Sequence, residues 1–238
     1  MKICSIGGVS ARSAACSPSP VLYSIGPMPR TATPRPTLRQ EKARWAVGHL
    51  LIGVDEVGRG PLAGPVVAAA VVFPANVKRI AGLRDSKLLS AAQRERLIPR
   101  IRERALRIAV AAASVREIDR FNIRVATAIA MRRAVTRVLV GLDAWQILVD
   151  GLPFPELGYA HQALVDGDAH CASIAAAGVV AKQVRDELMR RLALRHPLYR
   201  WETNMGYGTE EHQQGIRDHG PCIHHRRSFA PVAQMTLW

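Results

Sequence analysis

The sequence predicts an α/β fold, in which helices flank a mixed β-sheet. Two observations lead to this prediction. Short apolar or β-branched runs over residues 50–54 and 66–73 come first and are separated by glycine- and proline-rich residues, which is typical of two strands joined by a loop. Later runs of the same kind alternate with longer segments in which apolar residues recur at helical spacing. Strands followed by alternating strands and helices favour a sheet covered by helices.

The remaining elements follow from apolar spacing and from capping residues. We expect further strands over residues 108–114, 146–149 and 163–165, and helices over residues 90–107, 115–140, 171–194 and 209–219. Ser90 is a suitable N-cap for the first helix. We expect Pro99 to weaken or kink the middle of this helix. Gly220 and Pro221 end the last helix. The mostly small or apolar first half of the 171–194 segment indicates a helix buried against the sheet.

The first 48 residues differ in composition from the rest of the chain. They hold six of the 15 prolines and seven basic residues against one acid, Glu41. Such a segment buries too little apolar surface to offset the entropy of ordering. We therefore expect residues 1–48 to be a disordered, basic, proline-rich and dispensable extension, and residues 49–238 to form one domain. A targeting segment and a translation start at Met28 both stay open as explanations of the extension.

The charge balance and the cysteines narrow the class of protein. The chain of 238 residues carries a formal charge of +14, from 33 Lys and Arg against 19 Asp and Glu. This excess is typical of a protein with a polyanionic partner, but arginines that solvate helix faces would explain it as well. The four cysteines lack metal-binding spacing, which fits a reducing compartment. No apolar run approaches the ~18 residues of a membrane span, and the composition excludes a small secreted scaffold and a repeat array.

Several of the scarce acidic residues stand at the ends of predicted strands. Asp55 and Glu56 follow the first strand, Asp150 ends the strand over 146–149, and Asp166 and Asp168 precede the long buried helix. Taken singly, each is better explained as a turn residue or a helix cap. Together they would repel one another unless a cation neutralised them. Converging carboxylates at strand ends are what metal-dependent phosphodiester chemistry needs, so the joint pattern favours a metal site.

Gly58, Arg59 and Gly60 form a second feature directly after the first acids. Glycine lets the backbone approach a ligand closely, and arginine adds a planar donor for phosphate. In isolation, a tight turn with a solvent-facing arginine is the better explanation of these three residues. They do not belong to a dinucleotide-binding motif, because the loop leads into a strand and not into a helix.

In this context, residues 54–67 (VDEVGRGPLAGPVV) resemble the first motif of the ribonuclease HII family, the type 2 ribonucleases H. Further stretches resemble the other family motifs in the same order: residues 84–87 (RDSK), 149–151 (VDG), 167–168 (GD), 173–177 (SIAAA), 181–182 (AK), 204–212 (NMGYGTEEH) and 225–229 (HRRSF). The resemblance covers about residues 50–229. It implies a ribonuclease H-like mixed sheet flanked by helices, with a helical C-terminal extension from about residue 195.

The resemblance also implies an activity. The expected protein is an endoribonuclease that hydrolyses the RNA strand of RNA–DNA hybrids and incises 5′ to single ribonucleotides embedded in duplex DNA, in replication and repair. Two divalent cations, Mn²⁺ or Mg²⁺, would be held by Asp55, Glu56, Asp150 and Asp168, and the products would carry 5′-phosphate and 3′-hydroxyl ends. A cytoplasmic monomer that contacts nucleic acid and no membrane is expected.

The same resemblance assigns substrate contacts. Backbone groups of Gly58, Arg59 and Gly60 would contact the ribose 2′-hydroxyl, the group that distinguishes RNA from DNA, and Tyr207 would pack on the neighbouring deoxyribose. Four basic residues are candidates for phosphate binding, with a solvated surface position as the alternative for each: Lys87, Lys182, Arg226 and Arg227.

The sequence departs from the family pattern at Asp166, Gly178, Met205 and the pair His170 and Cys171. Asp166 adds negative charge two residues before Asp168 and is expected to raise the pKa of one carboxylate or to weaken metal selectivity. Gly178 is expected to lower helix propensity by ~1 kcal/mol. Because none of these departures is expected to touch the four acids or the Gly-Arg-Gly residues, we expect an active enzyme with altered affinity or metal preference.

Three alternatives stay open. A ribonuclease HIII-like hybrid nuclease would carry a folded N-terminal substrate-binding domain, and the N-terminal extension is too short and polar for one. A catalytically impaired hybrid-binding protein would lack at least one acid, and all four are present. An RNA-binding protein without chemistry would need aromatic platforms for base stacking, but the chain has only four Phe, four Tyr and four Trp.

Overall fold

The computed structural model describes residues 35–235, which are built around a five-stranded sheet with the strand order β3-β2-β1-β4-β5. The strands are β1 (Leu50–Val57), β2 (Val66–Val72), β3 (Arg107–Ala113), β4 (Trp145–Asp150) and β5 (Gln162–Leu164). β1 pairs antiparallel with β2 and parallel with β4, while β2 with β3 is antiparallel and β4 with β5 is parallel. The prediction of a mixed sheet is therefore confirmed.

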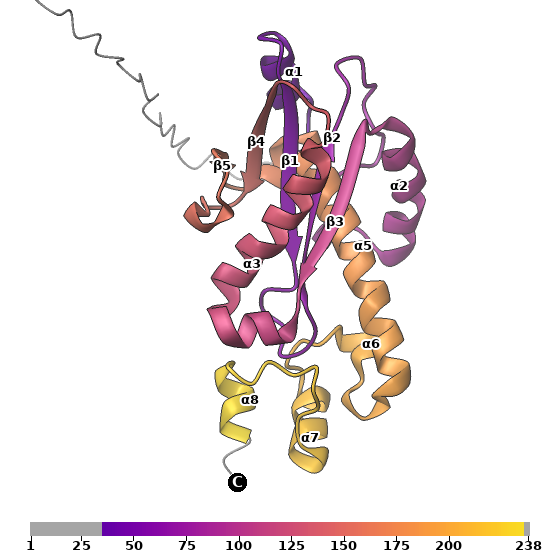
Figure 1. Ribbon diagram of the computed structural model, residues 1–238. Coiled ribbons are helices and arrows are strands. Elements are labelled where there is room, and N and C mark those ends of the chain that lie inside the picture. Colours follow the sequence, from indigo (N-terminus) through magenta and orange to yellow (C-terminus); the bar gives the residue numbers. More distant parts are fainter. Residues whose placement is uncertain (1–34, 236–238) are drawn as a thin grey trace, which may run out of the picture. The chain divides into compact units, whose positions relative to one another are not determined.

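Helices cover both faces of this sheet (Figure 1). They are α1 (Arg39–Trp45), α2 (Ala91–Arg104), α3 (Val115–Leu139), α4 (Gly167–His170), α5 (Ala172–Arg195), α6 (Trp201–Asn204), α7 (Glu210–His219) and α8 (Ala230–Met235). Ser90 caps α2 as expected, and the helix continues through Pro99. The segment over 115–140 is not one regular helix, because Asn122 has a positive φ of 66° and interrupts α3.

The strand residues alternate between two apolar layers, as the period of two requires. On β2, Val66, Ala68, Ala70 and Val72 pack with α3, and the residues between them pack with α2 and α5. Small residues let α5 come close to the sheet. A Cβ atom on Gly53 of β1 would lie 2.4 Å from the backbone of Ser173, so only glycine fits there.

The chain after α5 forms the expected helical C-terminal part. Short helices α6, α7 and α8 enclose a separate apolar cluster in which Tyr199 and Trp201 stack with ring centroids 5.2 Å apart. Figure 1 shows these helices beyond one end of the sheet. Across residues 35–235, no helix has the length and apolar character that a membrane crossing requires.

The expectation of a disordered extension through residue 48 is wrong for residues 35–48. Thr37 pairs with Cys171, and helix α1 follows. Glu41 is fully buried, and its Oε1 accepts hydrogen bonds from the backbone N–H and the hydroxyl of Ser173, at 2.7 and 2.6 Å, and from the thiol of Cys171. This carboxylate caps the start of α5, which orders the segment. The rest of the expected extension, residues 1–34, lies outside the described residues.

Candidate active site

Three of the predicted acids come together on the α5 side of the sheet. Asp55 lies in β1 and Asp150 ends the adjacent parallel strand β4, where Val54 pairs with Val149, one residue before each acid. Asp168 is in the first turn of α4, and its N–H donates to Asp150 Oδ1 at 3.3 Å. One carboxylate oxygen from each of the three acids lies within 4.8 Å of the others. The structure thus brings three of the acids noted near strand ends together.

The cluster is buried and carries unbalanced negative charge. Asp55 and Asp168 are each 7% exposed. Burial, together with the charge of Asp150, raises the pKa of Asp168 to about 7. The pKa of Asp55 is also raised, mainly by burial and then by the charges of the other acids. Lys87 Nζ is 3.9 Å from Asp168 and is the nearest basic group among the described residues, but its side chain is 78% exposed. A buried acid cluster without a matching cation is costly unless a metal neutralises it.

Glu56 is not part of the three-carboxylate cluster. It follows Asp55 in β1, so its side chain leaves the opposite face of the strand. Its carboxylate accepts from Arg59 Nη1 at 3.4 Å. Burial raises the pKa of Glu56, and the charge of Asp150 adds to this increase while Arg59 opposes it. Glu56 therefore interacts electrostatically with the cluster and borders it on the other face of β1.

Gly178 lies directly against the cluster, so the expectation that none of the departures touches the four acids is wrong for this residue. A Cβ atom at this position of α5 would lie 2.2 Å from Asp55 Oδ2. The missing side chain thus leaves the space that the Asp55 carboxylate occupies. In the folded chain, this departure from the family pattern touches one of the four acids.

Two further acids, Asp166 and Asp85, affect the pKa values of the cluster. Asp166 adopts the left-handed conformation (φ 53°) at the start of α4, and its charge adds to the burial that raises the pKa of Asp150. The expected effect of Asp166 on a carboxylate is thus confirmed. Asp85 was not singled out as a site residue, yet its charge helps to raise the pKa of Asp168. Its place in the motif at residues 84–87 was the available signal.

Gly58, Arg59, Gly60 and Tyr207 lie beside the carboxylates. We call residues 58–65, which connect β1 to β2, the recognition loop. Tyr207 is 45% exposed, and a Cβ atom on Gly60 would lie 3.7 Å from Tyr207 Cε1. The side chain of Arg59 is 47% exposed. The structure therefore brings Arg59, Gly60 and Tyr207 to one surface, whereas Gly58 is buried.

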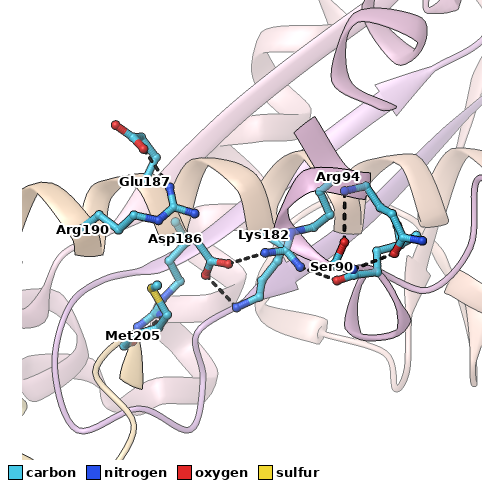
Figure 2. Close-up of polar contacts among 10 residues, drawn as sticks. Ser90, Arg94, Lys182, Asp186, Glu187, Arg190 and Met205 are labelled. Carbon is cyan, nitrogen blue, oxygen red and sulfur yellow. Dashed lines mark hydrogen bonds and ion pairs between the residues drawn. The ribbon is translucent and has the colours of Figure 1, made fainter. Parts of the chain in front are cut away.

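The four candidate phosphate-binding residues occupy different environments. Lys87 is exposed next to Asp168, and Arg227 is exposed. Figure 2 shows that Lys182 instead turns toward Asp186, which accepts from Lys182 Nζ at 2.6 Å and from Arg94 at 2.8 Å. Arg226 is fully buried, with its guanidinium group bonded to backbone carbonyls. Direct phosphate binding by Arg226 is therefore wrong.

Comparison with known proteins identifies the class first. The fold matches the ribonuclease H2 of Pyrococcus horikoshii with a TM-score of 0.62 and 23% identity, over 78% of this chain and 96% of that one. It matches Bst-RNase HIII, solved in complex with Mn²⁺, with a TM-score of 0.64 and 23% identity over 79% of this chain and 70% of that one. The structure thus has a ribonuclease H-type fold, as the motifs imply.

Sequence comparison then gives the family. The family model for ribonuclease HII matches residues 52–232. A ribonuclease HII of Sphingopyxis alaskensis is 50% identical over 202 residues, which cover 84% of this chain and all of the relative. The chain belongs to the ribonuclease HII family. It is a metal-dependent endoribonuclease of RNA–DNA hybrids, and the activity expected from the motifs is confirmed at this level.

Proposed function

We propose that this protein incises duplex DNA on the 5′ side of a single embedded ribonucleotide, in addition to cleaving longer RNA–DNA hybrids, and leaves 5′-phosphate and 3′-hydroxyl ends. The observation that carries the proposal is that β1 leads from the buried carboxylate of Asp55 directly into a loop whose exposed residues Arg59 and Gly60 lie beside Tyr207. The proposed metal site and the proposed sugar-binding surface are therefore adjacent.

The acid cluster fits a pair of hard divalent cations such as Mg²⁺ or Mn²⁺. Asp55, Asp150 and Asp168 offer only carboxylate oxygens, the ligands that these cations prefer, and burial, followed by the charges of neighbouring acids, raises the pKa of each. These three acids would hold the cations, with Glu56 bordering the site. When bound, such cations supply an activated water and stabilise the departing 3′-oxygen.

The protein's own groups position the substrate. The N–H of Asp168 holds the Asp150 carboxylate toward the cluster, and the ion pair with Glu56 keeps the Arg59 side chain beside β1. Backbone groups of Gly58, Arg59 and Gly60 would meet the ribose 2′-hydroxyl, and Tyr207 would pack on the next sugar. Lys87 and Arg227 are exposed and available to phosphates of the duplex.

We further propose that the enzyme acts as a cytoplasmic monomer in DNA replication and repair, without membrane contact. The basic balance of the chain, +14 overall, supports a nucleic-acid partner. A ribonuclease HIII-like specificity, confined to longer hybrids, is the second candidate because the type III structure shares the fold.

The test is cleavage of a DNA duplex that contains one ribonucleotide, with Mg²⁺, with Mn²⁺ and with EDTA. We expect metal-dependent incision 5′ to the ribonucleotide, and the two metal arms give the cation preference. Cleavage of a continuous hybrid alone would replace the proposal by the type III-like specificity. Binding without any cleavage would indicate an impaired site.

A further inference from the structure

Two arginines lie buried beneath the recognition loop without any carboxylate to pair with. Arg185, in α5, and Arg226, between α7 and α8, are both 0% exposed. Neither guanidinium group forms an ion pair within residues 35–235. Burial, together with the charge of Arg185, lowers the pKa of Arg226 to about 9, so this group remains protonated at neutral pH. A buried charge of this kind is tolerated only when hydrogen bonds satisfy it.

Backbone carbonyls of the loop satisfy Arg226. Its Nε donates to the carbonyl of Gly64 at 3.0 Å, its Nη1 to that of Arg59 at 2.8 Å, and its Nη2 to that of Gly58 at 2.5 Å. Bonds from an ionised donor are stronger than neutral ones, and a planar guanidinium fixes their directions. Arg226 therefore fixes the direction of the carbonyls at two of the three Gly-Arg-Gly residues.

Arg185 holds the other end of the same loop. Its Nη2 and Nε donate to the carbonyls of Ala63 and Pro65, both at 3.1 Å, and its Nη1 donates to Met205 at 2.9 Å. The side chain also fills the space next to Gly58, where a Cβ atom would lie 2.1 Å from Arg185 Nε. Gly58 is thus required to make room for this arginine, as well as for its positive φ of 92°.

With these carbonyls bonded to the two arginines, the N–H groups of Arg59 and Gly60 form the open side of the loop, whereas those of Leu62, Ala63 and Gly64 donate to other carbonyls. The N–H groups of Arg59 and Gly60 have no hydrogen-bond partner among the described residues, and both residues are exposed. Successive free N–H groups in a turn form a concave site for an oxygen ligand. The two arginines therefore determine which backbone groups a substrate meets.

Arg185 also joins the recognition loop to the segment that carries Tyr207. Besides the bond from Arg185 to Met205, the carbonyl of Gly206 accepts from the N–H of Leu62 at 2.8 Å. His212 Nδ1 lies 2.8 Å from the carbonyl of Tyr207. The loop and Tyr207 are thus held as one unit, although they are nearly 150 residues apart in the sequence.

We propose that Arg185 and Arg226 are positioning residues for ribose recognition: they turn the carbonyls of the recognition loop inward, and so hold the N–H groups of Arg59 and Gly60 and the ring of Tyr207 in register for one sugar step. This inference rests on the proposed function. It assigns part of the discrimination between ribose and deoxyribose to two side chains that do not touch the substrate.

The test compares Arg185→Lys and Arg226→Lys with the wild type. For each protein we would measure KM for a duplex with one ribonucleotide, and Ki for the all-DNA duplex of the same sequence used as a competitor. Lysine keeps the charge but cannot supply three directed donors. We expect KM to rise at least about tenfold, which is the effect of losing one or two well-placed hydrogen bonds. The Ki should change little, because the exposed basic side chains of the protein still bind the phosphates of the duplex.

Arg94→Lys is the matched control. Arg94 is also a buried arginine, 7% exposed, and donates to Asp186 (Figure 2) and to the carbonyl of Leu89, but it forms no hydrogen bond with the recognition loop. We expect it to lower the unfolding temperature and to leave the ratio of KM to Ki unchanged. An unchanged ratio in both Arg185→Lys and Arg226→Lys, or an equal change in Arg94→Lys, would overturn the inference. A wild-type enzyme that cleaves only continuous hybrids would instead overturn the proposed function.

Amide hydrogen exchange in the wild type decides the matter if the lysine variants do not fold. The free N–H groups of Arg59 and Gly60 should exchange rapidly and become protected by the duplex with one ribonucleotide, but not by the all-DNA duplex. Slow exchange at both positions in the free protein would show that these groups are already bonded, and would overturn the inference.

Discussion

The carboxylates of Asp55, Asp150 and Asp168 and the guanidinium groups of Arg185 and Arg226 are both clusters of like charge inside the protein, but they meet different partners. Six backbone carbonyls accept hydrogen bonds from the two arginines. The three carboxylates share a few N–H donors and one exposed lysine. The arginine cluster is therefore complete as it stands, whereas the acid cluster requires a ligand of opposite charge.

This difference separates a structural use of buried charge from a catalytic one. A satisfied cluster orders the chain around it, and here it orders the recognition loop. An unsatisfied cluster keeps raised pKa values and a high affinity for cations. Removing a group from each cluster should therefore have opposite effects on the stability of the metal-free protein.

The largest expected effect is that of Asp55→Asn on cleavage. Losing one carboxylate of the cluster should lower the cleavage rate by more than roughly 1,000-fold, because bound metal ions lower the activation barrier by several kcal/mol. Binding of the hybrid should be largely kept. The same substitution should raise the unfolding temperature in EDTA at pH 8, since it relieves repulsion.

Cleavage kinetics and thermal unfolding of the same samples measure both effects. Asp143→Asn, which removes an exposed acid between α3 and β4, is the control and should change neither. Full activity in a folded Asp55→Asn protein would refute the assignment of the metal site.

A smaller effect concerns the pH dependence of stability. The folded state holds a proton on Asp168 up to about pH 7, whereas the unfolded state loses it near the ordinary value of 3.8. The free energy of unfolding in EDTA should therefore fall as pH rises from about 4 to about 7, by no more than about 1.4 kcal/mol per pH unit for this one group.

Urea unfolding at pH 5 and pH 8 compares the wild type with Asp168→Asn. The substitution should flatten the decrease that the wild type shows over this interval. An identical decrease in both proteins would mean that Asp168 does not hold the proton.

The smallest expected effect is on the N-terminal helix. Glu41→Ala leaves the N–H and hydroxyl of Ser173 without an acceptor, which should lower the free energy of unfolding by about 1–3 kcal/mol. Glu95→Ala, at an exposed position of α2, is the control and should stay within about 0.5 kcal/mol of the wild type. Equal stability of the two variants in urea unfolding would contradict the capping role of Glu41.

The sequence predicted the sheet and the long helices because their apolar periods are local. It also predicted the convergence of Asp55, Asp150 and Asp168, since strand-end acids of neighbouring strands meet at one edge. Their motifs in residues 54–67, 149–151 and 167–168 added the family resemblance. Local pattern and family motif agreed at these positions.

Other parts could not be predicted because their partners are remote in the sequence. In the sequence, Glu41 is a single acid in a basic, proline-rich stretch. Only the folded chain places it against Ser173, 132 residues away. Arg226 cannot be told from its exposed neighbour Arg227 without the loop carbonyls that surround it. Gly178 shows its contact with Asp55 only when α5 lies on β1.

The most direct test of the contrast between the two clusters is a calorimetric titration of Mn²⁺ into the wild type, Asp55→Asn and Arg226→Lys at pH 8. The wild type should bind Mn²⁺, and Asp55→Asn should bind it at least about tenfold more weakly, because carboxylates of the cluster are the ligands. Arg226→Lys should bind it as the wild type does. Equal Mn²⁺ affinity in the wild type and Asp55→Asn would contradict the account, because the acid cluster would then not be the site that awaits a cation.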